Sequence, residues 1–117
     1  DLNFDSITEL DESRPLCALA VKMLGNHIKG PASMRAGRIL DMAKYLNADG
    51  VAYFNNWGCK KTLGGAGIVK NILEESGIPV LVLDGDGCDR DNINDGQMKT
   101  RLQAFLEMLE EKNEIRM

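Results

Sequence analysis

Residues 51–67 read VAYFNNWGCKKTLGGAG, and the rest of the chain is organised around this stretch. A short apolar run ends in two asparagines, and a loop around Cys59 then leads into a glycine cluster that opens a helical pattern. The pattern predicts a strand, a loop and a helix start, which is where α/β proteins place their chemistry. Lys60 and Lys61 follow Cys59, and their charge and the helix-terminal N–H groups should both favour its thiolate form. The alternative is a reduced structural cysteine in an ordinary loop.

A second strand is predicted downstream of this stretch. The first run, residues 51–54, is apolar without alternation, which is typical of a parallel strand covered on both faces. A helical pattern up to about residue 76 precedes the second strand, residues 80–83. Strand, helix and strand in this order predict a right-handed βαβ unit and hence an α/β fold. Residues 55–59 and the acidic loop 84–91 should then lie on one edge of the sheet.

Two helical patterns precede the first strand. The earlier one begins after Ser13 at Pro15 and stops at Gly25. It is apolar almost all round, so we expect it to be buried or covered by another element, with Cys17 packed in that apolar surface. The later one opens at Pro31. Its predicted buried face holds Ile39, Met42, Ala43 and Leu46, and its predicted solvated face holds Arg35, Arg38, Asp41 and Lys44.

A last helix is predicted after the acidic loop. Asn94 can cap it, and Gln97 three residues later completes the pattern of a capping box. Its apolar face holds Met98, Leu102, Phe105, Leu106 and Leu109. The chain therefore contains only two good strands, whereas a doubly wound sheet normally has four or more. We expect residues 1–117 to form a single, incomplete α/β domain with an irregular lead-in at residues 1–12.

Composition limits the classes of function. The net charge of −4 and the lack of a basic stripe argue against nucleic-acid binding. No apolar run approaches the roughly 20 residues that a membrane helix needs, and the N-terminus lacks the features of a signal peptide. Three cysteines are an odd number, which disfavours a secreted disulfide framework. These features predict a protein of the reducing cytoplasm.

Several common site motifs are incomplete. Residues 58–62 end like a phosphate-binding loop but lack its glycines, and residues 65–67 lack the third glycine of a dinucleotide fingerprint. The acidic loop has Cys88 and Asp89 where a calcium loop needs an oxygen ligand and a glycine, so we interpret it as a solvated, locally capped turn. No Cys-x-x-Cys pair supports zinc. His27, the only histidine, is interpreted as a loop residue.

Five segments together resemble the C-terminal domain of the 2-hydroxyacyl-CoA dehydratase family, which is related to benzoyl-CoA reductase. They are residues 16–24, 44–51, 53–60, 78–86 and 95–109. Each motif alone is moderately specific, but their shared order and spacing make the resemblance strong. It implies a flavodoxin-like or Rossmann-like α/β domain.

The resemblance also implies a cofactor. Family subunits carry an oxygen-sensitive [4Fe-4S] cluster that three cysteines of one subunit hold, which leaves one iron open. The cysteine of the family's Gly-Cys-Lys motif is one of the three, and this role carries over to Cys59. The other two ligands belong to an N-terminal domain outside this chain. Cys17 and Cys88 match no ligand position of the family.

The chemistry implied by the resemblance is the removal of water from a 2-hydroxyacyl-CoA. An ATP-hydrolysing activator protein injects one electron, a ketyl radical of the thioester expels the adjacent hydroxyl, and the electron returns to the cluster. Lys60 and Lys61 could tune the cluster potential or meet an anionic part of coenzyme A, or could be solvated lysines. Trp57 could shield the cluster or pack in the core.

Three functions remain open from the sequence. The first is the cluster-bearing C-terminal part of a dehydratase subunit, inactive alone and active with an N-terminal domain or partner subunit, an activator protein and an acyl-CoA substrate. The second is a non-catalytic truncated or split subunit that serves as an interaction module. The third is a benzoyl-CoA-reductase-like electron-transfer subunit.

Overall fold

The structure is a computed structural model that describes residues 10–25 and 29–116. His27 and most of the expected lead-in lie outside these residues. The elements in chain order are α1 (Pro15–Gly25), α2 (Ala32–Tyr45), β1 (Val51–Asn56), α3 (Lys60–Glu75), β2 (Val80–Gly85), the short 3₁₀ helix η1 (Arg90–Asn92) and α4 (Asp95–Arg116).

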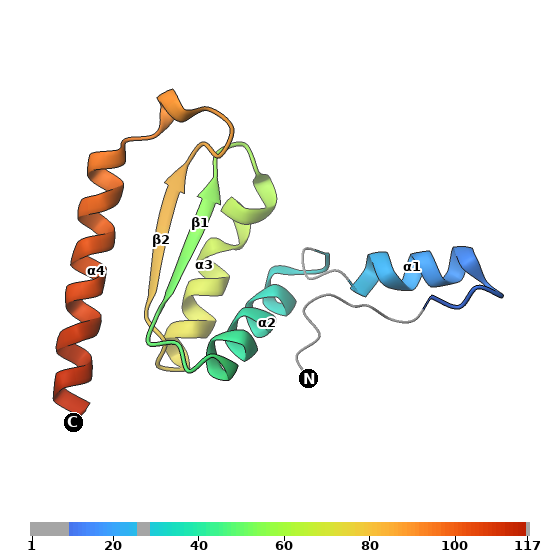
Figure 1. The fold of residues 1–117 in the computed structure, drawn as a ribbon, viewed down its shortest axis with the longest axis horizontal. Helices are drawn as coiled ribbons and strands as arrows, with labels where there is room; N and C mark the ends of the chain where they lie inside the picture. Colours follow the sequence, from blue (N-terminus) through green and yellow to red (C-terminus); the bar gives the residue numbers. More distant parts are fainter. Residues whose placement is uncertain (1–9, 26–28, 117) are drawn as a thin grey trace.

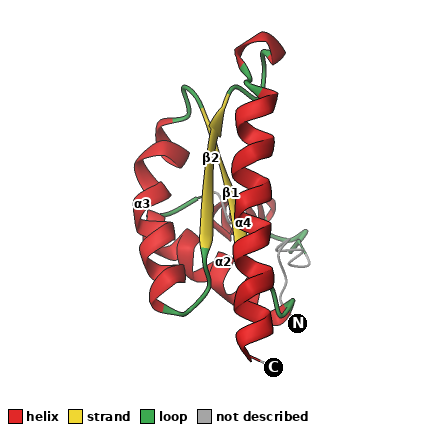
Figure 2. Ribbon diagram, turned by 90° about the vertical axis from the view of Figure 1, so that its left-hand side faces the viewer, coloured by secondary structure: helices red, strands yellow, loops and turns green. Residues whose placement is uncertain are grey.

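The two strands form a parallel pair joined through α3. The register runs from Val51 opposite Val80 to Asn56 opposite Gly85. Figure 2 shows α3 and α4 on opposite sides of the sheet, and α2 packs against α3. The predicted α/β class, with a parallel βαβ unit flanked by helices, is confirmed.

The core lies between the sheet, α3 and α2. Its buried apolar residues are Ala36, Ala43, Val69, Leu73 and Val80. Helix α2 contributes its two alanines, Ala36 and Ala43, to this core. The prediction that Met42 and Leu46 belong to the buried face of α2 is wrong, because both side chains are exposed. The predicted solvated face is also partly wrong, because Arg35 and Arg38 are only half exposed.

Burial along β1 alternates, contrary to the expectation of a strand covered on both faces. Tyr53 is half-buried and Asn55 is fully buried on one face, whereas Phe54 on the other face is 42% exposed. The cause is the position of α4, which contacts β2 and leaves much of that face of β1 open. The apolar sequence of β1 does not show that one face of the strand is only partly covered by a helix.

Helix α1 corrects two further expectations. None of its residues is buried, and Leu16 is 81% exposed. Cys17 is exposed rather than packed in a core. Figure 1 shows α1 lying away from the sheet. An apolar pattern predicts that a helix needs cover, but within residues 10–25 and 29–116 no element supplies it.

Helix α4 begins as predicted. The Asn94 side-chain oxygen accepts a hydrogen bond from the backbone N–H of Gln97 at 3.0 Å, which caps the helix. Of its predicted apolar face, Phe105 and Leu109 are half-buried against Gly50, where an added Cβ would lie 2.8 Å from the Phe105 ring. Among the described helices, none combines the length and hydrophobicity that a bilayer crossing requires.

Candidate functional site

The carboxyl ends of β1 and β2 join two loops at one edge of the sheet, as predicted. The Asn55 side-chain amide donates to a carboxylate oxygen of Asp84 at 3.0 Å. The backbone N–H of Trp57 donates to the carbonyl of Gly85 at 2.8 Å. The N–H of Gly87 donates to the Asn56 side chain at 2.9 Å. The cysteine loop and the acidic loop are therefore held together by hydrogen bonds.

Cys59 lies between β1 and α3, as the residue immediately before the helix. Gly58 has a φ of +80°, which a glycine adopts without strain and which turns the chain out of the strand. The N–H of Cys59 donates to the carbonyl of Asn56 at 3.1 Å, and its own carbonyl accepts the N–H groups of Thr62 and Leu63. The residue itself is partly exposed.

The pKa of the Cys59 thiol is lowered from its usual value. The largest cause is the Thr62 side-chain hydroxyl, followed by the Thr62 backbone N–H, while burial opposes the shift. A smaller contribution comes from the positive charge of Arg35. The predicted preference for thiolate is thus supported. The lowering comes from the Thr62 hydroxyl, from the helix-terminal N–H groups of Thr62 and Lys61 as predicted, and from the charge of Arg35, rather than from the ammonium groups of Lys60 and Lys61.

Arg35 is a neighbour of the cysteine loop that the sequence did not reveal. Its guanidinium donates to the carbonyl of Lys61 at 2.8 Å, in the first turn of α3. It passes close to Gly65, where an added Cβ would lie 2.6 Å from the guanidinium and 3.2 Å from the Ala32 Cβ. A glycine inside a helix often marks such a close approach, and this was the only signal available in the sequence.

The other residues expected near Cys59 lie in the same loop. Trp57 is 50% exposed. Lys60 and Lys61 occupy the first turn of α3, and both are exposed.

The acidic loop is a locally capped turn, as interpreted from the sequence. One carboxylate oxygen of Asp86 accepts the N–H groups of Cys88 at 2.9 Å and Asp89 at 3.2 Å. The other accepts the side-chain amide of Asn92 at 3.1 Å. The backbone bond from Cys88 and the bond from Asn92 lower the pKa of Asp86. Cys88 itself is exposed.

The described residues do not provide a complete metal site. No group of three or more His, Cys, Asp or Glu side chains in residues 10–25 and 29–116 is arranged to hold a metal ion. A cluster that uses Cys59 would therefore need ligands from elsewhere.

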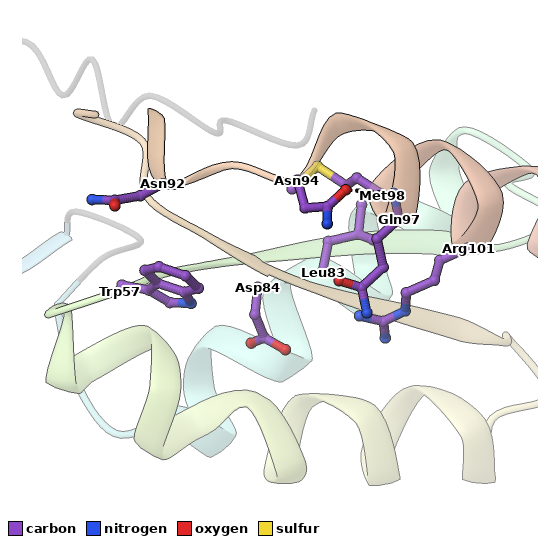
Figure 3. Close-up of a pocket in the computed structure, with 8 residues that line it drawn as sticks. All are labelled: Trp57, Leu83, Asp84, Asn92, Asn94, Gln97, Met98 and Arg101. Carbon is purple, nitrogen blue, oxygen red and sulfur yellow. Dashed lines mark hydrogen bonds between the residues drawn. The ribbon is translucent and has the colours of Figure 1, made fainter. Parts of the chain in front are cut away.

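A pocket of about 110 Å³ lies beside the cysteine loop (Figure 3). It is lined by Trp57 after β1, by the end of β2, by η1 and by the first turns of α4. The lining residues are Trp57, Leu83, Asp84, Asn92, Asn94, Gln97, Met98 and Arg101. Sequence analysis placed Trp57 and Asp84 at this edge but did not foresee that α4 closes it.

Comparison with known proteins assigns the family. No curated protein and no solved structure matches the chain. The family model described as 2-hydroxyglutaryl-CoA dehydratase, D-component, matches residues 2–109. This match covers nearly the whole chain and all of β1, α3 and β2, together with the loops that carry Cys59 and Asp84. The chain therefore belongs to the 2-hydroxyglutaryl-CoA dehydratase D-component family.

Proposed function

We propose that this chain is the C-terminal part of a 2-hydroxyacyl-CoA dehydratase subunit, in which Cys59 supplies one thiolate ligand of a [4Fe-4S] cluster. The observation that carries the proposal is the environment of Cys59, a partly exposed cysteine with a lowered thiol pKa at the carboxyl edge of the sheet. Thiolate is the form of cysteine that ligates iron. Family membership supplies the reaction class, which is a lyase acting on a CoA thioester.

The donor set fits a shared cluster rather than one held by this chain alone. A cluster of this type needs several thiolates, and the described residues offer no group of three possible ligands. The partly exposed Cys59 suits a site completed by an N-terminal domain or a partner dehydratase subunit. When bound, the cluster would supply one-electron chemistry at the thioester, after an ATP-dependent activator protein has delivered the electron.

The residues around Cys59 would then influence the charge of its thiol, attract an anionic ligand and limit the access of water. The hydrogen bonds of Thr62 and the Arg35 charge lower the pKa of the Cys59 thiol and so favour the thiolate form that ligates iron. Lys60 and Lys61 are exposed beside it and would attract an anionic portion of coenzyme A or raise the cluster potential. Trp57, half exposed in the same loop, would limit the access of water to the cluster.

A second candidate is a non-catalytic interaction module. The observation that favours it is α1, whose apolar residues Leu16, Leu19 and Leu24 are exposed and would be covered by a partner chain. A benzoyl-CoA-reductase-like electron-transfer subunit is a third candidate within the same family chemistry. The reaction product separates it from a dehydratase, because such a reductase adds electrons and protons to an aromatic ring and a dehydratase forms an enoyl-CoA with loss of water.

The test uses the assembled enzyme with its activator and ATP. Conversion of a 2-hydroxyacyl-CoA to the enoyl-CoA is measured for the wild type, for Cys59→Ser and for the matched control Cys88→Ser. The proposal expects turnover in the wild type and in the control, and none in Cys59→Ser. Turnover by Cys59→Ser at the wild-type rate would refute the role of Cys59. The enzyme is also assembled without this chain. If the chain joins the assembly but the rate of enoyl-CoA formation is the same in its absence, the interaction module is favoured.

A further inference from the structure

The pocket beside Trp57 has a composition that favours an uncharged ligand. Its charged side chains are Arg101 and Asp84, which carry opposite signs, and the remaining polar side chains are the amides of Asn92, Asn94 and Gln97. Leu83 and Met98 add apolar surface. Side-chain amides both donate and accept hydrogen bonds, so they complement ligand groups that do the same, above all other amides.

The loop beside the pocket disfavours anions. Asp86, Asp89 and Asp91 lie between the end of β2 and the start of α4, with Arg90 as the one basic residue among them, and Asp95 is the first residue of α4. Asp86 and Asp89 are tied to Asn92, which is itself part of the pocket wall. Like charges within a Debye length of about 10 Å repel a phosphate or carboxylate. A polyphosphate end of a ligand would therefore not enter here.

Some side chains of the pocket wall are already held by hydrogen bonds within the protein, and others are free to bond a ligand. The Asn94 oxygen is used by the N–H of Gln97, and one guanidinium nitrogen of Arg101 donates to the carbonyl of Val82 at 2.7 Å. Within the part of the chain that the structure describes, the side-chain amide of Gln97 makes no hydrogen bond. Figure 3 shows Trp57 towards one end of the pocket and Gln97 with Arg101 towards the other.

The size of the pocket limits what it can hold. At about 110 Å³ it is smaller than the roughly 300–1,000 Å³ of sites that enclose a whole small molecule. It would enclose one segment of an extended ligand, with the remainder lying outside. Trp57 lies two residues before Cys59, so a ligand that leaves the pocket past the indole reaches the cysteine loop.

We propose that this pocket binds the pantetheine arm of the acyl-CoA, the uncharged, amide-bearing segment that precedes the thioester. The inference rests on the proposed function for the identity of the ligand. The amides of the arm meet Gln97 and Arg101, its apolar part lies against Leu83 and Met98, and its sulfur end passes Trp57 towards Cys59. The charged nucleotide end of coenzyme A stays outside, away from the acidic loop.

The test uses the single tryptophan of the chain as the reporter. The full chain is titrated with reduced pantetheine while the emission of Trp57 is followed. We expect a saturable change, and a 3- to 10-fold weaker affinity in Gln97→Leu, since loss of one hydrogen bond costs about 0.5–1.5 kcal/mol. Gln97 is exposed, so this variant should keep its fold, which urea unfolding verifies. Gln103→Leu, at another exposed position of α4, is the matched control and should bind normally.

Three results would overturn the inference. They are the absence of a saturable change in Trp57 emission, equal weakening in both glutamine variants, and equal or tighter binding of 3′,5′-ADP or of an N-acetylated dipeptide amide. The titration needs neither iron nor activator. If pantetheine does not bind, the pocket proposal fails and the proposed role of Cys59 is unaffected. If pantetheine binds but the assembled enzyme shows no turnover, the proposed function fails and the pocket proposal stands.

Discussion

The guanidinium of Arg35 donates to the carbonyl of Lys61 at 2.8 Å, across 26 residues of sequence, and so ties α2 to the first turn of α3. The same side chain contributes to the lowered pKa of Cys59. The packing of two helices is thereby coupled to the ionisation of the proposed ligand. Gly65 makes this possible, because an added Cβ there would lie 2.6 Å from the guanidinium.

Gly65→Ala should therefore be less stable than Gly64→Ala by about 1–2 kcal/mol. Both substitutions gain about 1 kcal/mol of helix propensity. Only Gly65→Ala displaces Arg35 from the Lys61 carbonyl, a hydrogen bond with a charged donor, since an added Cβ at Gly64 meets nothing within 4 Å. Urea unfolding of the two variants measures the difference. Equal stabilities would show that Arg35 rearranges at no cost.

Thr62→Val should raise the pKa of Cys59, because the Thr62 hydroxyl is the largest cause of its lowering. The rate of Cys59 alkylation, measured against pH with Cys17 and Cys88 replaced by serine, should reach its midpoint at a higher pH than in the parent. Thr62→Ser should restore the lower midpoint. Thr100→Val is the matched control, because the Thr62 hydroxyl donates to the Cys59 carbonyl at 3.1 Å and the Thr100 hydroxyl donates in the same way to the Gly96 carbonyl at 2.9 Å. An unchanged midpoint in Thr62→Val would contradict this account.

Asn55→Asp should destabilise the fold at neutral pH by about 1–3 kcal/mol. Asn55 is only 4% exposed and donates to Asp84, so the new carboxylate would face an existing one. Like-charge contact raises the pKa of the pair in the folded state. The loss is therefore complete above the raised folded-state pKa, shrinks as the pH falls through it, and is gone below the unfolded pKa of about 4.

The control for this experiment is the neighbouring Asn56→Asp, which keeps the oxygen that accepts the N–H of Gly87. It should lose less stability than Asn55→Asp at pH 7. Chemical unfolding at pH 7 and at pH 4 measures both variants. A deficit in Asn55→Asp that grows on acidification would show that the contact with Asp84 has been misjudged.

Leu73→Ala and Leu16→Ala should differ sharply in stability. Leu73 is 0% exposed at the centre of the core, so its truncation should cost about 2–5 kcal/mol. Leu16 is 81% exposed on α1, so its truncation should cost less than about 0.5 kcal/mol. Thermal or urea unfolding compares them. A large loss in Leu16→Ala would mean that α1 packs against the domain in solution.

The sequence predicted the elements well and their packing less well. The pattern of polar and apolar residues along the sequence correctly predicted β1, α3 and β2, because strand ends, glycines and helix periodicity are local signals. The exposure of Met42 and Cys17 could not be predicted, since periodicity says that a face is apolar but not which element covers it. The edge that carries Cys59 and Asp84 followed from the parallel topology alone. The roles of Thr62 and Arg35 did not, because they depend on side-chain positions at the start of α3.

The central claim is that Cys59 ligates iron, and metal content tests it most directly. The chain, assembled with its partner subunit, is reconstituted anaerobically with iron and sulfide, and both are quantified in the wild type, Cys59→Ser and Cys88→Ser. The account predicts a labile cluster in the wild type and in Cys88→Ser, and its loss in Cys59→Ser. Equal iron and sulfide in Cys59→Ser and the wild type would contradict it.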